Sequence, residues 1–197
     1  MWLEVTVSSG GRVIGRNGGM DGDREVDPWS HFVNVFLLDR EGNRIARRNP
    51  QDIFVPLYNN QIPPGAGQTV HYELRLPPQL KEPVTVEIKL NYRKFDKQYM
   101  DFVARAARPG DHPIRGLTPG EKYLNELPVT VLATDRLTFP VAGSAAQVTN
   151  ATSKIPPWQR WNDYGIGLLL KGKAELRQAA DAFREVEKLG RYDGPHN

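Results

Sequence analysis

Strict alternation of apolar and polar side chains over residues 69–92 constrains the fold more than any other feature of the sequence. Within residues 84–93 the apolar side chains take the even positions and the polar ones the odd positions, the pattern of a strand with one buried face. Residues 69–76 repeat it, and the proline-rich stretch 77–83 cannot continue a ladder because proline lacks a backbone N–H. We therefore predict an antiparallel pair of strands with a charged outer face, which would carry His71, Glu73, Arg75, Glu87, Lys89 and Arg93.

Other segments predict further strands. Residues 3–14 indicate a hairpin turning at Gly10 and Gly11. Residues 31–38 form the most apolar run, which predicts a central strand buried on both faces, followed by a turn at 39–43. Residues 53–58 predict a further short strand, which lies at an edge or contains a bulge because Pro56 interrupts it. The last two strands are expected at residues 128–135 and 137–141.

The spacing between apolar residues changes from two positions to three and four towards the C-terminus. Residues 95–103 carry a short helical stripe, and residues 105–123 read as a long surface loop. From Trp158 onwards apolar residues recur at three and four positions, in two helices separated by Gly172. The predicted fold class is mainly β, with an antiparallel immunoglobulin-like β-sandwich over residues 1–142, a linker over 143–157 and a C-terminal α-helical hairpin over 158–197.

Composition excludes several chemistries. The chain of 197 residues has no cysteine, so it holds no disulfide, thiolate nucleophile, iron–sulfur site or covalent haem attachment. A net charge of +3, from 26 basic and 23 acidic residues, requires no nucleic-acid partner. No stretch reaches the ~20 apolar residues of a membrane span, so we expect no membrane insertion. Residues 1–5 already show a strand pattern without a secretory leader, so we expect a segment of a longer protein.

A glycine-rich acidic loop at residues 17–28 offers a candidate metal site. Asp21, Asp23 and Asp27 fall at odd-numbered positions of this loop and predict oxygen ligands for calcium. An EF-hand counted from Asp21 would need glycine and glutamate where Val26 and Phe32 stand, so turn chemistry is the alternative.

Two other clusters have competing interpretations. Arg44, Arg47 and Arg48 form the densest basic spot, which we interpret as a solvated loop rather than a phosphate site, because no aromatic platform accompanies it in the sequence. Trp158 and Trp161 would suit a sugar-stacking platform, but their spacing of three favours packing inside the helical hairpin.

The C-terminal hairpin resembles a tetratricopeptide repeat, in which small and large residues knit two antiparallel helices together. A single repeat cannot bury its own apolar face, so the helices either pack on the β-sandwich or begin a longer array. The matching residues are Trp161, Tyr164, Gly165, Leu168 and Gly172 in the first helix and its turn, and Ala179, Phe183 and Val186 in the second.

Most of the chain also resembles a β-rich domain of bacterial multihaem cytochrome c proteins that carry such repeats. The resemblance implies a haem-binding part upstream, haem c in the parent protein and a periplasmic or extracellular location. It also implies protein partners, either a haem-binding domain or further helical repeats. The matching stretches are residues 2–5, 27–28 with His31, 38–43, 48–53, 62–65, 71–72, 92–95, 127–129 and 161–170.

Histidine is the residue type here that would reach a haem as an axial ligand from outside. His31 and His71 lie in the matching stretches and are the candidate haem ligands in trans. For His71 the alternative is a solvated surface side chain, and for His31 a buried, hydrogen-bonded one.

The sequence contains no GxSxG, HExxH or phosphate-binding glycine loop, so we predict that the chain is not an enzyme. We expect a non-catalytic structural and protein-interaction module of a larger multihaem cytochrome c, repeat-containing protein. The alternative is an independent ligand-binding β-sandwich for calcium or carbohydrate. A hydrolase using Asp21, Asp23 or Asp27 is a third hypothesis.

Overall fold

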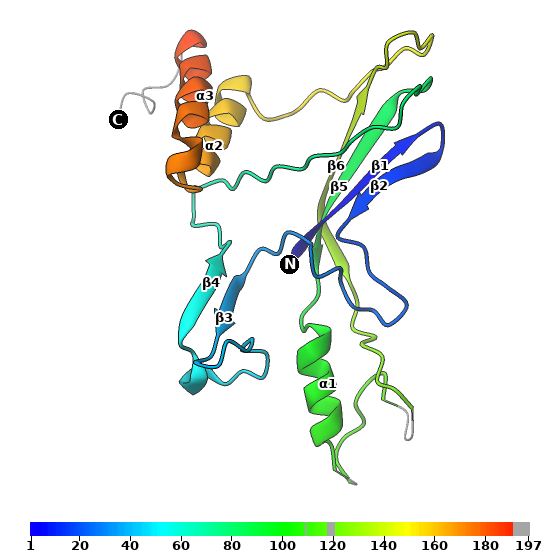
Figure 1. Ribbon diagram of the computed structural model, residues 1–197, viewed down its shortest axis with the longest axis vertical. Coiled ribbons are helices and arrows are strands. Elements are labelled where there is room, and N and C mark those ends of the chain that lie inside the picture. Colours follow the sequence, from blue (N-terminus) through cyan, green and yellow to red (C-terminus); the bar gives the residue numbers. More distant parts are fainter. Residues whose placement is uncertain (109, 118–120, 191–197) are drawn as a thin grey trace. The chain divides into compact units, whose positions relative to one another are not determined.

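The computed structural model describes residues 1–108, 110–117 and 121–190. The chain divides into two compact units (Figure 1). The first comprises Met1–Asn59 and Arg75–Asn150, and the second comprises Asn60–Leu74 and Ala151–Asn197. Residues 191–197 of the predicted helical hairpin and parts of the predicted 105–123 loop lie outside the described residues.

A four-stranded antiparallel sheet forms the centre of the first unit. Its strands are β1 (Trp2–Ser9), β2 (Arg12–Asn17), β5 (Val84–Tyr92) and β6 (Thr130–Phe139), in the order β2-β1-β5-β6. The predicted hairpin is confirmed: Ser9 pairs with Arg12 across Gly10 and Gly11, whose positive φ angles suit a two-residue turn.

The alternation of β1 and β5 puts their valines on one face of the sheet. Val5, Val7 and Val84 are buried there, and Ile14, Leu80, Val86, Ile88 and Val141 pack against them. Full burial of such a side chain stabilises the fold by roughly 1.5–3 kcal/mol. The opposite face is polar, and on it Arg16 forms an ion pair with Glu4 at 2.9 Å.

Strand β6 differs from the prediction of two strands at residues 128–135 and 137–141. It is continuous, and an irregularity in its pairing with β5 falls between Leu90 and Asn91. At its outer edge the side chain of Asn150 pairs with the backbone of Thr138, donating to its carbonyl oxygen at 2.9 Å and accepting from its N–H at 2.7 Å.

A second, two-stranded sheet joins β3 (Val35–Leu38) and β4 (Val55–Asn59) in antiparallel fashion. The 3-10 helix η1 (Pro50–Asp52) precedes β4. The predicted turn at 39–43 is present, since the N–H of Asp39 donates to the carbonyl of Asn43 at 2.9 Å. Strand β3 is only half-buried, so the prediction of burial on both faces is wrong.

Helix α1 (Lys97–Ala106) follows β5 after a short connection, as the helical stripe predicted. Asp96 begins it, because its carboxylate accepts the N–H of Tyr99 at 2.8 Å and so satisfies one of the free donors of the first turn.

The second unit contains α2 (Pro157–Leu169), the 3-10 helix η2 (Lys173–Glu175) and α3 (Leu176–Lys188). Leu168, Ala179 and Val186 are fully buried between the two long helices. A Cβ placed on Gly165 would lie 2.6 Å from Cε1 of Phe183, so the ring packs directly on the α2 backbone. The predicted helical hairpin is confirmed.

Residues 67–69 lie against α2 rather than in a sheet. The hydroxyl of Thr69 donates to the carbonyl of Tyr164 at 3.2 Å, and a Cβ on Gly167 would lie 2.5 Å from that hydroxyl oxygen. No strand is present at residues 69–76, so the predicted strand there is wrong. The alternation correctly indicated an extended segment, but this segment packs against a helix instead of pairing with another strand.

The coarse fold class is therefore confirmed: antiparallel β-structure precedes a C-terminal helical hairpin. The described strands form one four-stranded and one two-stranded sheet.

Candidate functional site

The acidic loop folds as a tight turn held by its own carboxylates. The carboxylate of Asp21 accepts the N–H of Glu25 at 2.8 Å, and that of Asp27 accepts the N–H of Trp29 at 2.9 Å. Asp23 instead forms an ion pair with Lys122 at 2.5 Å. The hydrogen bond from Lys122, together with its charge, lowers the pKa of Asp23 from its ordinary value.

The three predicted calcium ligands are thus engaged in separate contacts. Among residues 1–108, 110–117 and 121–190 there is no group of three or more His, Asp or Glu side chains arranged to hold a metal ion. Turn chemistry accounts for the positions of Asp21 and Asp27.

The two candidate haem ligands lie in different units, with His31 in the first and His71 in the second. His31 is half-buried, and its carbonyl accepts the N–H of Leu3 at 3.0 Å. The side chain of His71 is exposed. A role for either histidine as a haem ligand stays a prediction.

The cluster of Arg44, Arg47 and Arg48 does have aromatic partners, which corrects the expectation that no aromatic platform accompanies it, although Arg47 and Arg48 are exposed as a solvated loop would be. Arg48 lies 4.6 Å from the ring centroid of Phe95, and Arg47 lies 5.4 Å from that of Phe102. Such cation–π contacts stabilise by ~0.5–2 kcal/mol each, depending on exposure. The cluster therefore packs the loop between β3 and β4 onto α1.

Arg44 extends this contact to the start of α1. Its guanidinium pairs with the carboxylate of Asp96 at 2.9 Å and donates to Gln98 at 3.1 Å. It also lies over the ring of Phe36 of β3, at 5.1 Å.

Arg93 contradicts the predicted charged outer face, because only 8% of it is exposed. Strand β5 ends at Tyr92, and the Arg93 side chain then turns inward. Its guanidinium donates to the carbonyl of Arg24 at 2.7 Å and contacts the sulfur of Met20 at 3.6 Å. Burial, and secondarily the charge of Arg24, lowers the pKa of Arg93.

A chain of buried polar contacts holds this arrangement. Arg24 has a positive φ of 60° and donates from its guanidinium to the carbonyls of Asn125 and Leu127, at 2.5 and 3.1 Å. Asn125 is fully buried and donates to the carbonyl of Phe95 at 3.1 Å. The acidic loop, the residues before β6 and the start of α1 are thereby fixed to one another.

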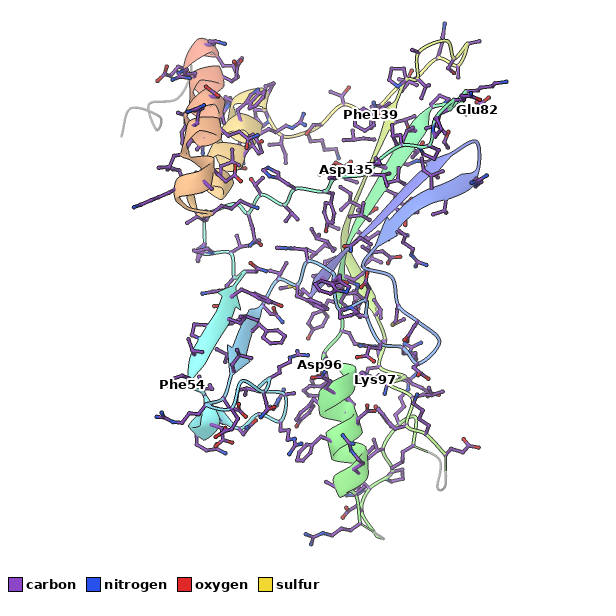
Figure 2. The ribbon with its side chains drawn as sticks, viewed as in Figure 1. Phe54, Glu82, Asp96, Lys97, Asp135 and Phe139 are labelled. Carbon is purple, nitrogen blue, oxygen red and sulfur yellow. The ribbon has the colours of Figure 1, made fainter. Side chains whose placement is uncertain are left out.

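The acidic loop and the start of α1 contribute to the walls of an open cavity of about 220 Å³. Residues 31–33 close one side by pairing with the start of β1, where the N–H of Val33 donates to the carbonyl of Met1 at 3.1 Å. Asp96 and Lys97 lie at the beginning of α1 (Figure 2). The cavity is lined by Met1, Trp2, Glu25, Val26, Phe32, Asn34, Arg44, Arg93, Phe95, Asp96, Lys97 and Gln98.

Trp161 was expected to pack inside the hairpin, but it is 40% exposed. Its ring meets that of Tyr164 edge-on, with centroids 6.1 Å apart. Together with Pro157 and Arg160 these rings line a surface hollow of about 440 Å³ in the second unit.

Sequence reasoning missed the cavity because its residues come from five separate stretches of the chain. Arg93 had the alternation of a surface position, and Asn34 stood inside a run interpreted as a strand. The break after Tyr92, where Arg93 and Lys94 are followed by Phe95 and Asp96, was the one local signal that the strand pattern had ended.

No protein-family model, curated protein or solved structure matches the chain. Within the described part of the chain, the helices are too short or too polar to cross a bilayer.

Proposed function

We propose that this chain is a non-catalytic structural and protein-interaction module of a larger multihaem cytochrome c protein that carries helical repeats. The observation that carries the proposal is an exposed apolar run at β4. Ile53, Phe54, Val55 and Leu57 are 42%, 57%, 41% and 62% exposed. Contiguous exposed apolar side chains on a monomer mark interaction surfaces.

The position of this run on a strand strengthens the proposal. Within the described residues β4 pairs only with β3, so its other edge is open to a further strand or an apolar surface. Phe54 also supports the cation–π contact with Arg40, at 4.9 Å, which holds the ring at the surface (Figure 2).

In this proposal the β-rich unit is an immunoglobulin-like sandwich and the hairpin a tetratricopeptide-like repeat. The antiparallel pairing of all six strands and the small residues between α2 and α3 support it. The partner is a haem-binding domain or further repeats of the same protein. Its location is periplasmic or extracellular, because haem c is attached outside the cytoplasm.

The absorption spectrum of the natural, full-length protein tests the identity of the parent. A c-type haem spectrum is expected, and a full-length gene without a CxxCH motif would rule the proposal out. The surface is tested by Leu57→Lys, with Leu132→Lys on β6 as a control of similar exposure. Only the first should weaken binding to the haem-bearing part, and equal effects would show that β4 is not the contact.

A second candidate function is carbohydrate binding, which the exposure of Trp161 beside Tyr164 favours. Aromatic rings at a surface hollow stack on sugar rings through their apolar faces. Affinity electrophoresis in polysaccharide gels should then show retardation that Trp161→Ala abolishes. Unretarded migration of the unaltered protein in every polysaccharide tried would remove this candidate.

A further inference from the structure

The cavity beside α1 contains a buried cation, Arg93, that makes no direct ion pair. Within the described residues, Arg93 forms no ion pair with a carboxylate at 4.0 Å or less, although it is over nine-tenths buried. Its guanidinium donates to the carbonyl of Arg24 and contacts the sulfur of Met20. Burial of an unpaired guanidinium is costly, so an anion entering this cavity would be favoured.

The charges of the side chains that line the cavity also favour an anionic ligand. Three cationic side chains line it, from Arg44, Arg93 and Lys97, against the two carboxylates of Glu25 and Asp96. Asp96 is already paired with Arg44. Lys97 pairs with Asp101 at 2.7 Å, outside the lining. Of the three, Arg93 is therefore the one without a direct ion pair, while the charges of Asp96 and Glu25 act on it from beyond 4.0 Å.

Asn34 adds a second, independent requirement. Asn34 lines the cavity, and its side-chain oxygen is buried and has no hydrogen-bond partner among the described residues. An unsatisfied buried acceptor costs free energy, which a ligand carrying an O–H or N–H group would recover.

Size and apolar surface limit the ligand further. At about 220 Å³ the cavity is smaller than typical drug-sized sites. Trp2, Phe32 and Phe95 contribute aromatic surface to it. A compact ligand with an apolar or aromatic body therefore fits best.

We propose that this cavity binds a small organic monocarboxylate bearing a hydroxyl or amino group, with the carboxylate on Arg93 and the donor on the side-chain oxygen of Asn34. The first turn of α1 forms part of the same wall through Asp96, Lys97 and Gln98. The N–H groups of a first turn have no partners within the helix and favour anions. This site is independent of the protein partner proposed above.

Three matched probes test the proposal on the full chain. 3-Phenyllactate has the carboxylate and the hydroxyl, 3-phenylpropionate lacks the hydroxyl, and 3-phenyl-1,2-propanediol lacks the carboxylate. Calorimetry, with NMR shifts of the Trp2 indole N–H, should show saturable binding of phenyllactate. Phenylpropionate should bind about tenfold more weakly and the diol below detection, since each loses one polar contact.

Asn34→Asp is the sharpest variant because it preserves shape and adds a carboxylate to a residue of the same cavity lining as Arg93. It should abolish binding of phenyllactate, whereas Gln147→Glu, the same charge change at an exposed position, should leave it unchanged. Arg93→Gln should also abolish binding, provided that thermal unfolding shows a folded protein.

Two results would overturn the proposal. One is the absence of saturable acid binding to the unaltered chain, or equal binding of acid and diol. The other is unchanged binding in folded Asn34→Asp. The probe series on the unaltered chain decides the matter even where a variant does not fold.

Discussion

Replacing Gly167 by alanine tests whether residues 66–69 lie on α2. In an ordinary helix this change stabilises by up to ~1 kcal/mol, because glycine has the greater backbone entropy to lose. Here the added Cβ would lie 2.5 Å from the hydroxyl oxygen of Thr69, 2.7 Å from its backbone nitrogen and 3.1 Å from the carbonyl carbon of Gln68. The sign of the effect should therefore reverse.

The magnitude follows from two opposed contributions. Overpacking costs ~1–3 kcal/mol, and displacement of Thr69 also removes its hydrogen bond to Tyr164, which is worth ~0.5–1.5 kcal/mol. Against the helix-propensity gain of ~1 kcal/mol, we expect a net loss of about 0.5–3.5 kcal/mol in the free energy of unfolding. Two of the three closest neighbouring atoms belong to the backbone. Replacing Thr69 by a smaller residue should therefore restore only part of the lost stability.

Urea unfolding followed by far-UV circular dichroism and by the fluorescence of the α2 tryptophans measures the change. Gly165→Ala is the matched comparison, because its Cβ would meet the ring of Phe183 rather than backbone. Adding Phe183→Leu should relieve Gly165→Ala but not Gly167→Ala. A gain of ~1 kcal/mol in Gly167→Ala would refute the packing of residues 66–69 on α2.

Three further outcomes are expected. Leu168→Ala should lower the free energy of unfolding in urea by ~2–5 kcal/mol, because the side chain is fully buried. Leu169→Ala, at a neighbour that is 45% exposed, should lower it by less than ~1 kcal/mol. Similar losses in the two variants would contradict the α2–α3 interface. Lys122→Gln should raise the pKa of Asp23 towards its ordinary value in an NMR pH titration; because that folded-state pKa is depressed, the stabilisation is present above the unfolded pKa and lost as pH falls through the folded one. Arg48→Ala should lower the free energy of unfolding by ~0.5–2 kcal/mol, since its guanidinium lies over two rings, and an unchanged value would show that the stacking contributes nothing.

The local patterns predicted those elements whose partners are near in sequence. The β1–β2 hairpin follows from Gly10 and Gly11, and the C-terminal helices follow from the spacing of their apolar residues. Strand β5 was identified by the same alternation that misassigned residues 69–76. Alternation specifies an extended chain with two faces, but not whether a strand or a helix covers one of them.

The candidate site was beyond the reach of these patterns because its contacts are long-range. Arg48 packs on Phe95, and Arg24 reaches Asn125 across a sequence separation of 101. Apart from the break in alternation after Tyr92, nothing in the neighbouring residues distinguishes the buried Arg93 from an exposed arginine on a strand. Its environment exists only once the acidic loop, α1 and the residues before β6 have come together.

The division of the second unit between two stretches of sequence has a consequence for how the chain reaches its fold. The hydrogen bond from Thr69 to Tyr164 spans 95 positions, and residues 75–150 of the first unit lie within that span. On the ribosome, residues 60–74 must therefore wait until α2 has emerged before they find their place. If the first unit folds before α2 emerges, it shortens the effective loop between Thr69 and Tyr164. A shorter loop lowers the entropic cost of bringing these two residues together. A fragment starting at residue 151 would lose the segment that packs on α2, so cutting the polypeptide once cannot release the helical unit intact.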